Sequence, residues 1–214
     1  MGIPIYLLGK SGSGKSTSMR NLNPDDIMII KVINKRLPFN ESQFKIWDAT
    51  SKTGSKFATD DYALVKALLS RMEEVGKKIV IIDDIQYLMA NEFMRRASEK
   101  GFEKFNEIAF KMWDLIDFIQ NTINPDMRVY MMSHIDEEDG SQKIKTIGKM
   151  LDDKICLEGL ATIVLGSAKL KDDYIFETQT NGRNTLKSPI GMFEKTEPND
   201  LKIIDEKIVA FYGI

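Results

Sequence analysis

Cysteine and histidine are almost absent from this sequence. Its 214 residues include one cysteine, Cys156, and one histidine, His134. A single cysteine excludes an internal disulfide framework and is typical of a protein from a reducing compartment. Two such residues are also too few for a zinc site built from several cysteine and histidine ligands. We therefore expect a fold stabilised by its hydrophobic core alone, which a chain of this length can supply.

Long apolar runs and an excess of charge are missing too. No stretch approaches the ~20 apolar residues that a membrane-spanning helix requires. No basic segment precedes the first apolar run, so we expect no signal peptide. The 30 Lys and Arg against 32 Asp and Glu give a net charge of −2, so any nucleic-acid binding would have to use a local patch. These absences predict a cytoplasmic protein without a membrane segment.

The sequence does contain short apolar runs that alternate with longer segments of helical period. This alternation is typical of an α/β fold with a mainly parallel central sheet flanked by helices. Buried strands are predicted at residues 3–8, 27–33, 44–47, 78–85, 128–134 and 161–166, and helices at 15–21, 59–72, 102–123 and 205–212. Residues 174–180 alternate apolar and polar side chains, which predicts an antiparallel edge strand near the C-terminus. No linker or repeat interrupts the pattern, so we predict a single domain over residues 1–214.

A glycine-rich loop carries the strongest functional signal. Residues 9–16 read GKSGSGKS and match the phosphate-binding pattern G-x-x-x-x-G-K-[ST] in full, between a predicted strand and a predicted helix. Main-chain N–H groups of such a loop donate to phosphate oxygens, its lysine reaches the β- and γ-phosphates, and its Ser or Thr hydroxyl ligates Mg²⁺. The residues predicted to bind a nucleotide are Gly9, Lys10, Ser11, Gly12, Ser13, Gly14, Lys15, Ser16 and Thr17, with Ser16 as the metal ligand.

Acidic residues at the ends of predicted strands are candidates for the Mg²⁺ ligand and for the catalytic base. Asp83 and Asp84 follow the apolar run 79–82, as in a Walker B segment. We expect Asp83 to hold Mg²⁺ through water and Asp84 to polarise the attacking water, although a helix-cap or turn role fits Asp84 equally well. Asp48, at the end of another predicted strand, is the competing candidate for the base.

The single histidine ends the predicted strand 128–134. Lone histidines are usually structural. Parallel strands, however, deliver their carboxyl ends to the ligand crevice of an α/β sheet. His134 is therefore also a candidate sensor of the γ-phosphate.

Several segments together resemble small phage-encoded AAA-family ATPases with a RecA-like core, including Sak-type single-strand annealing ATPases. The segments are GKSGSGKSTSMRNL, NKRLPF, IVIIDDIQYLMANEFMRRASEKGFEKFNEI, KIKTIGKMLDDKICLEGLATIVL and TNGRNTLKSPIGMF, and the resemblance spans residues 5–212. It implies a RecA-like P-loop ATPase that uses ATP and Mg²⁺. It also implies a role in phage DNA recombination or replication in the host cytoplasm, on single-stranded DNA and beside a single-strand-binding protein.

The resemblance further implies a homo-oligomer, a ring or a filament, because RecA-like ATPases complete the site with basic residues from a neighbouring subunit. Arg183 and Lys187 are the cations of segment 180–189 and resemble such a finger, whereas a solvated loop is the other interpretation. The RecA pattern also places a glutamate after an early strand, where this chain has Asn34. The choice of base therefore stays open between Asp84 and Asp48.

DNA contact has the weakest signal in the sequence. Lys143, Lys145 and Lys149 follow an acidic, glycine-containing turn at residues 136–140. They indicate a mobile loop for a phosphate backbone, and an ordinary charged surface explains them equally well.

Two other functions fit the same loop. One is a non-catalytic ATP-binding adaptor or loader of a replication protein, which the missing glutamate favours. The other is a P-loop nucleotide kinase, which the size allows but which would need an arginine-bearing lid over the phosphates. The N-K-x-D motif of GTPases and the L-S-G-G-Q stretch of ABC-type ATPases do not occur, which argues against both classes. The preference for ATP over GTP rests on the family resemblance alone.

Overall fold

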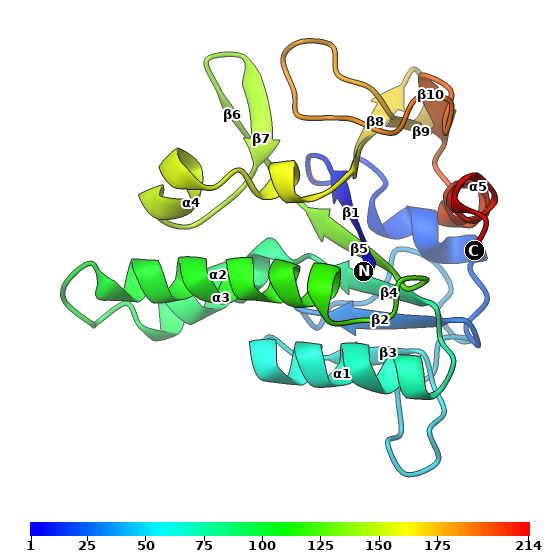
Figure 1. The fold of residues 1–214 in the computed structure, drawn as a ribbon, viewed down its shortest axis with the longest axis horizontal. Helices are drawn as coiled ribbons and strands as arrows, with labels where there is room; N and C mark the ends of the chain where they lie inside the picture. The colour runs from blue at the N-terminus through cyan, green and yellow to red at the C-terminus, as the bar shows by residue number, and fades with distance from the viewer.

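An eight-stranded sheet forms the centre of the computed structural model, which describes residues 1–148, 150–151 and 154–214 (Figure 1). The strands lie in the order β10-β9-β8-β1-β5-β4-β2-β3. Their bounds are β1 (Ile3–Leu8), β2 (Ile27–Lys31), β3 (Lys56–Ala58), β4 (Ile79–Asp83), β5 (Arg128–Ser133), β8 (Ile163–Leu170), β9 (Asp173–Glu177) and β10 (Thr196–Pro198). A separate hairpin consists of β6 (Ile135–Glu138) and β7 (Ser141–Ile144).

The six strands from β8 to β3 are parallel, whereas β9 and β10 are antiparallel to their neighbours. The order places β5 between the glycine-loop strand β1 and the acidic strand β4. The predicted fold class is confirmed: α/β, with a mainly parallel sheet, flanking helices and antiparallel strands near the C-terminus.

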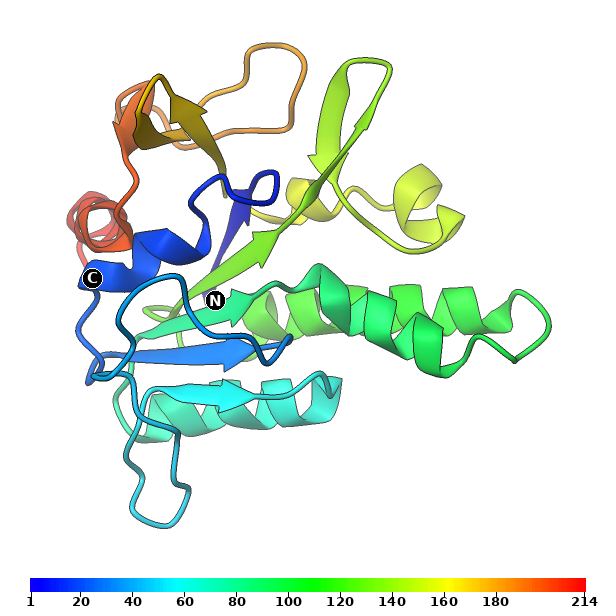
Figure 2. The same cartoon turned by 180° about the vertical axis from the view of Figure 1, so that it is seen from behind.

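Helices cover both faces of the sheet, as Figures 1 and 2 show from opposite sides. One face carries α1 (Tyr62–Glu74), α2 (Gln86–Arg95) and α3 (Glu103–Asn121). The other carries the 3₁₀ helix η1 (Ser16–Asn21) and α5 (Leu201–Tyr212). The short helices α4 (Lys149–Lys154) and η2 (Leu157–Leu160) precede β8.

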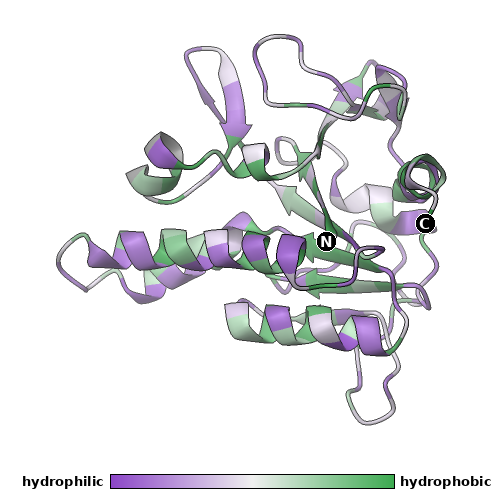
Figure 3. Ribbon diagram, viewed as in Figure 1, coloured by the Kyte–Doolittle hydropathy of each residue, from purple (hydrophilic) through white to green (hydrophobic). Residues whose placement is uncertain are grey.

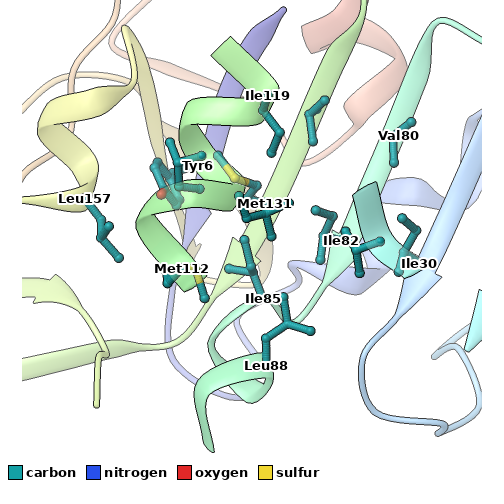
Figure 4. Packing of buried hydrophobic residues seen from close by; sticks show 14 of the residues in the cluster. Tyr6, Ile30, Val80, Ile82, Ile85, Leu88, Met112, Ile119, Met131 and Leu157 are labelled. Carbon is teal, nitrogen blue, oxygen red and sulfur yellow. The ribbon is translucent and has the colours of Figure 1, made fainter. Parts of the chain in front are cut away.

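The central strands β1, β2, β4 and β5 are buried along almost their whole length, because helices cover both faces of the sheet. Successive side chains alternate between two cores: Tyr6 packs with the α1–α3 core, whereas Ile5 and Leu7 pack with the η1–α5 core. Figure 3 shows the central strands hydrophobic throughout and the helices with both colours. Figure 4 shows the first core, where Met131 of β5 lies among Ile85 and Met112. The sheet is therefore held rigidly beneath the loops at its carboxyl edge.

The structure departs from the predicted elements in several places. Residues 44–47 are not a strand of the sheet, because Ile46 makes an isolated bridge to Lys56 and the sheet strand is β3 itself. The helix after the glycine loop is 3₁₀, α2 follows β4 directly, and the turn at 136–140 belongs to the β6–β7 hairpin. β9 is covered by β10 and so is not the edge strand. The differences among the strands come from pairing between segments far apart in the sequence, which a local sequence pattern does not predict.

A buried ion pair ties α5 to the sheet. Arg128 Nε and Nη2 donate to the two carboxylate oxygens of Asp205 at 2.9 and 2.7 Å. The Tyr130 hydroxyl donates to the same carboxylate at 2.7 Å. Both charged side chains are almost inaccessible to solvent. Each charge is compensated by the hydrogen bonds of the other side chain. Removal of one partner would therefore leave the other charge buried and uncompensated.

We expect Asp205→Ala to lower the free energy of unfolding by about 3–5 kcal/mol, because Arg128 would stay buried without a counter-charge. Urea denaturation measures the change. The matched control is Glu206→Ala, which removes an exposed acid from the next position of the same helix and should change stability by about 0.5 kcal/mol or less. Equal effects of the two substitutions would contradict this role for the ion pair.

Candidate functional site

The glycine loop joins β1 to η1 and is shaped by its glycines. Gly12 and Gly14 have φ angles of 77° and 98°, a left-handed conformation that glycine adopts without strain. A Cβ atom on Gly14 would lie 2.9 Å from Cδ1 of Tyr174, so a side chain is excluded there. The chain therefore wraps closely around the space in front of η1, as phosphate binding by main-chain N–H groups requires.

Lys15 lies inside this loop. Its ammonium donates to the carbonyl oxygens of Gly9 and Lys10 at 2.7 and 3.1 Å, and the residue is 5% exposed. Burial lowers the pKa of the Lys15 ammonium, while Asp84 and Asp83 act in the opposite direction. The side chain is thus held in the loop, and the nearby carboxylates partly offset the cost of burying its charge.

Ser16 and Asp83 meet beside Lys15, although they are far apart in the sequence. The Ser16 hydroxyl donates to Asp83 Oδ1 at 3.0 Å. Asp83 is 1% exposed, and its other oxygen, Oδ2, is buried without a hydrogen-bond partner among the described residues. Burial, and then the neighbouring Asp84, raises the pKa of the Asp83 carboxyl. A buried carboxylate with a free oxygen, next to a hydroxyl, is a donor set that fits Mg²⁺.

Asp84 lies on the other side of the same space and is 2% exposed. Its Oδ2 is 3.3 Å from Nζ of Lys35 and 3.6 Å from Nε2 of His134. Its Oδ1 is buried and has no hydrogen-bond partner among the described residues. The peptide bond between Asp83 and Asp84 is cis. Asp84 lines the cavity in front of the loop, and the N-terminus of α2 has no side-chain cap hydrogen bond.

His134 follows β5 and completes this wall. Burial, and then the Lys15 ammonium, lowers the pKa of the His134 imidazole and so favours its neutral form. The ring also packs edge-on against Tyr87, with 6.3 Å between the ring centroids. A neutral imidazole in this position can accept or donate one hydrogen bond towards the cavity.

A cavity of about 390 Å³ opens in front of these side chains. Its lining comes from the glycine loop and from the segments that follow β2, β4 and β5. The lining residues are Ser11, Gly12, Gly14, Lys15, Ser16, Thr17, Lys35, Arg36, Pro38, Asp84, His134 and Tyr174. The carboxyl ends of parallel strands meet at one edge of the sheet, which is where α/β folds bind ligands.

The loop therefore has the sequence of a phosphate-binding P-loop and lies between a parallel strand and the following helix. No protein-family model and no curated protein matched the chain. Among solved structures, the chain is similar to a KaiC-like protein from the hyperthermophilic archaeon Pyrococcus horikoshii OT3. The two are 12% identical, the alignment covers 85% of this chain and 81% of the other, and the TM-score is 0.48.

No further metal centre is evident in the part of the chain that the structure describes. Within it, no group of three or more His, Cys, Asp or Glu side chains could hold a metal ion. Within the same residues, no helix has the length and apolar character that a membrane crossing requires.

Three of the predicted catalytic residues lie away from the P-loop cavity. Asp48 does not line it, because its carboxylate accepts hydrogen bonds from Thr50 N and Ser51 Oγ within an exposed turn. Its segment does not run as a sheet strand, so it is not carried to the carboxyl edge. Arg183 and Lys187 are also absent from the described lining and lie in the segment after β9.

The structure adds residues that the sequence reasoning missed. Lys35 and Arg36 line the cavity, and their position after a buried strand was the available signal. Tyr174 reaches the P-loop through the β8–β9 pairing, which leaves no local signal. Ser167 of β8 supports the loop by donating its hydroxyl to Ser13 O at 2.6 Å, and it accepts from Asn199 Nδ2 at 3.3 Å.

Proposed function

We propose that this protein binds ATP with Mg²⁺ and hydrolyses it. The observation that carries the proposal is the contact between Ser16 and Asp83 beside the buried Lys15. These three residues come from the ends of two different strands, and the fold brings together the pair of oxygen ligands and the cation that phosphoryl transfer needs. Mg²⁺ supplies charge neutralisation when bound, with Ser16 and, through water, Asp83 as its protein ligands.

The remaining residues of the cavity have distinct parts in this proposal. Hydrolysis adds water across the bond between the bridging oxygen and the γ-phosphorus, giving ADP and phosphate. Asp84 lines the cavity, and its Oδ1 has no hydrogen-bond partner among the described residues, so it would orient the water and accept its proton. Lys15 stabilises charge on the phosphate oxygens, and His134 offers a hydrogen bond to the terminal phosphate.

Tyr174 is suited to bind the nucleobase of the nucleotide. It lines the cavity next to Gly14, which places an aromatic ring beyond the phosphate loop. A nucleotide base has a π face that stacks on such a ring. The cavity volume of about 390 Å³ lies within the range of ligand pockets, about 300–1,000 Å³.

We further propose that the ATPase acts on single-stranded DNA in recombination or replication, as a homo-oligomer and beside a single-strand-binding protein. The support is the sequence resemblance to phage ATPases. In addition, the β6–β7 hairpin contacts both the P-loop and the segment that contains Arg183: Lys10 Nζ lies 2.9 Å from Glu137 Oε2, and Gln142 N donates to Arg183 O at 2.8 Å. Figures 1 and 2 show the hairpin and this segment at the same end of the molecule.

Charges on the hairpin limit which lysines are available for DNA. Lys143 lies 3.5 Å from Glu138 and is therefore paired. Lys145 is exposed, and Lys149 lies outside the described residues. A finger role in a neighbouring subunit is proposed for Arg183, which is exposed, and for Lys187, which is half-buried.

The deciding experiment measures Mg²⁺-dependent ATP hydrolysis with and without single-stranded DNA. We expect hydrolysis that rises at least about tenfold with DNA, because the hairpin can transmit DNA binding to the P-loop through Lys10 and Glu137. Hydrolysis indifferent to DNA would contradict the DNA part. ATP binding without turnover would favour the adaptor, and phosphate transfer to a nucleoside monophosphate would favour the kinase.

A further inference from the structure

The ion pair between Lys35 and Asp84 lies inside the cavity proposed for the triphosphate. Nζ of Lys35 is 3.3 Å from Asp84 Oδ2, and Lys35 also lines the cavity with Lys15 and Ser16. The other side chain near this oxygen is His134, with Nε2 at 3.6 Å, and the Lys15 ammonium interacts with the same carboxylate. Among the ion pairs of the described residues, Lys35 places the nearest cation against a carboxylate that is 2% exposed.

Lys35 is held by fewer contacts than the buried Lys77. Its side chain is 48% exposed, and it lies in the irregular segment after β2. Its ammonium makes one hydrogen bond in the described structure, to Asp84. Lys77, by contrast, is buried and donates to three carbonyl oxygens. A long flexible stem with one contact can redirect its ammonium at little cost.

The charges of the cavity favour such a movement when a triphosphate binds. The terminal phosphate would enter a space that already contains Asp83 and Asp84, and these carboxylates repel it. A cation that leaves Asp84 for the γ-phosphate is attracted by the larger negative charge. Its departure also frees the carboxylate to orient water.

We propose that Lys35 exchanges partners: it neutralises Asp84 in the nucleotide-free protein and moves to the γ-phosphate of a bound nucleoside triphosphate. Lys35 is then a catalytic residue that distinguishes a nucleoside triphosphate from a diphosphate. It releases Asp84, the catalytic base, only when the γ-phosphate is present. This inference rests on the proposed nucleotide binding.

The first test compares the dissociation constants of ADP and of a non-hydrolysable ATP analogue, both with Mg²⁺, by calorimetry. Lys35→Gln should weaken the analogue about 10- to 100-fold, the size of a lost hydrogen bond to a charged group, and change ADP affinity about threefold or less. Lys35→Arg should restore the preference. The control is Lys66→Gln, which removes a lysine paired with Asp114 between α1 and α3, remote from the P-loop, and should alter neither constant.

The second test asks whether Lys35 really leaves Asp84. Thermal melting of Lys35→Gln, Asp84→Asn and the double variant gives the coupling between the two side chains. We expect non-additive melting temperatures without nucleotide and additive ones with the saturating ATP analogue. The Lys66 and Asp114 pair, treated in the same way, should show the same coupling in both states.

The outcomes separate this inference from the proposed function. Wild-type protein that binds neither nucleotide would refute both. Wild-type protein that binds both nucleotides, with equal losses or no loss in Lys35→Gln, would refute the exchange alone. Coupling between Lys35 and Asp84 that persists unchanged with the analogue would also overturn it.

Discussion

Lys15→Ala should abolish ATP binding and hydrolysis, with a loss of at least about 100-fold in both. The Lys15 ammonium lies inside the P-loop, where it donates to the carbonyl oxygens of Gly9 and Lys10. Bound phosphate oxygens would lie in the same small space, so no other lysine in the described structure can take its place without a change of the loop. Equilibrium binding of a fluorescent ATP analogue and a steady-state hydrolysis assay measure the two losses.

The matched control for Lys15 is Lys77→Ala. Lys77 is also a buried lysine that donates to main-chain carbonyl oxygens, and burial lowers the pKa of its ammonium too. It lies two residues before β4 begins, at the opposite end of that strand from Asp83. Lys77→Ala should therefore reduce the melting temperature but leave ATP affinity unchanged in the folded protein. Full ATP binding by Lys15→Ala would contradict the phosphate site.

Asp83→Asn should remove the dependence of hydrolysis on Mg²⁺ and lower turnover at least about 100-fold. The asparagine side chain can still accept the hydrogen bond from Ser16, so the local structure is kept. It carries no charge to hold a divalent cation. A titration of turnover against Mg²⁺ concentration measures the effect, and an unchanged dependence would refute the assigned metal role.

The same substitution should stabilise the nucleotide-free protein. Burial and the neighbouring Asp84 raise the pKa of Asp83 in the folded state, which means that the ionised carboxylate is less stable there than in the unfolded chain. Removing that charge at pH 7 should raise the melting temperature by about 2–4 °C, the shift expected from ~1 kcal/mol in a protein of this size. Glu158→Gln is the control, since Glu158 is a buried carboxylate outside the cavity that accepts from Ile144 N. This variant should leave the Mg²⁺ dependence intact.

The two effects of Asp83→Asn have one cause. Two adjacent carboxylates, at 1% and 2% exposure, make the nucleotide-free cavity electrostatically unfavourable. The same arrangement makes it favourable for Mg²⁺ and for the cations Lys15 and Lys35. A site that is less stable than it could be, in exchange for binding, is common in enzymes.

The sequence by itself determined the P-loop, the aspartates after β4 and the α/β class. These features are local: the glycine pattern sets backbone conformation over eight residues, and buried parallel strands are recognisable as continuous apolar runs. The proximity of His134 to the phosphate loop could also be predicted, because strand ends share one edge of a parallel sheet.

Only the tertiary structure decided which of the competing side chains reach the cavity. Asp84 faces it and Asp48 does not, because residues 44–47 form no sheet strand. Lys35 and Tyr174 reach it through the path of the chain after β2 and through the pairing of β8 with β9. Contacts of this kind depend on strand order and on the course of irregular segments. Neither has a local period in the sequence, so physical proximity at this site is a property of the folded chain alone.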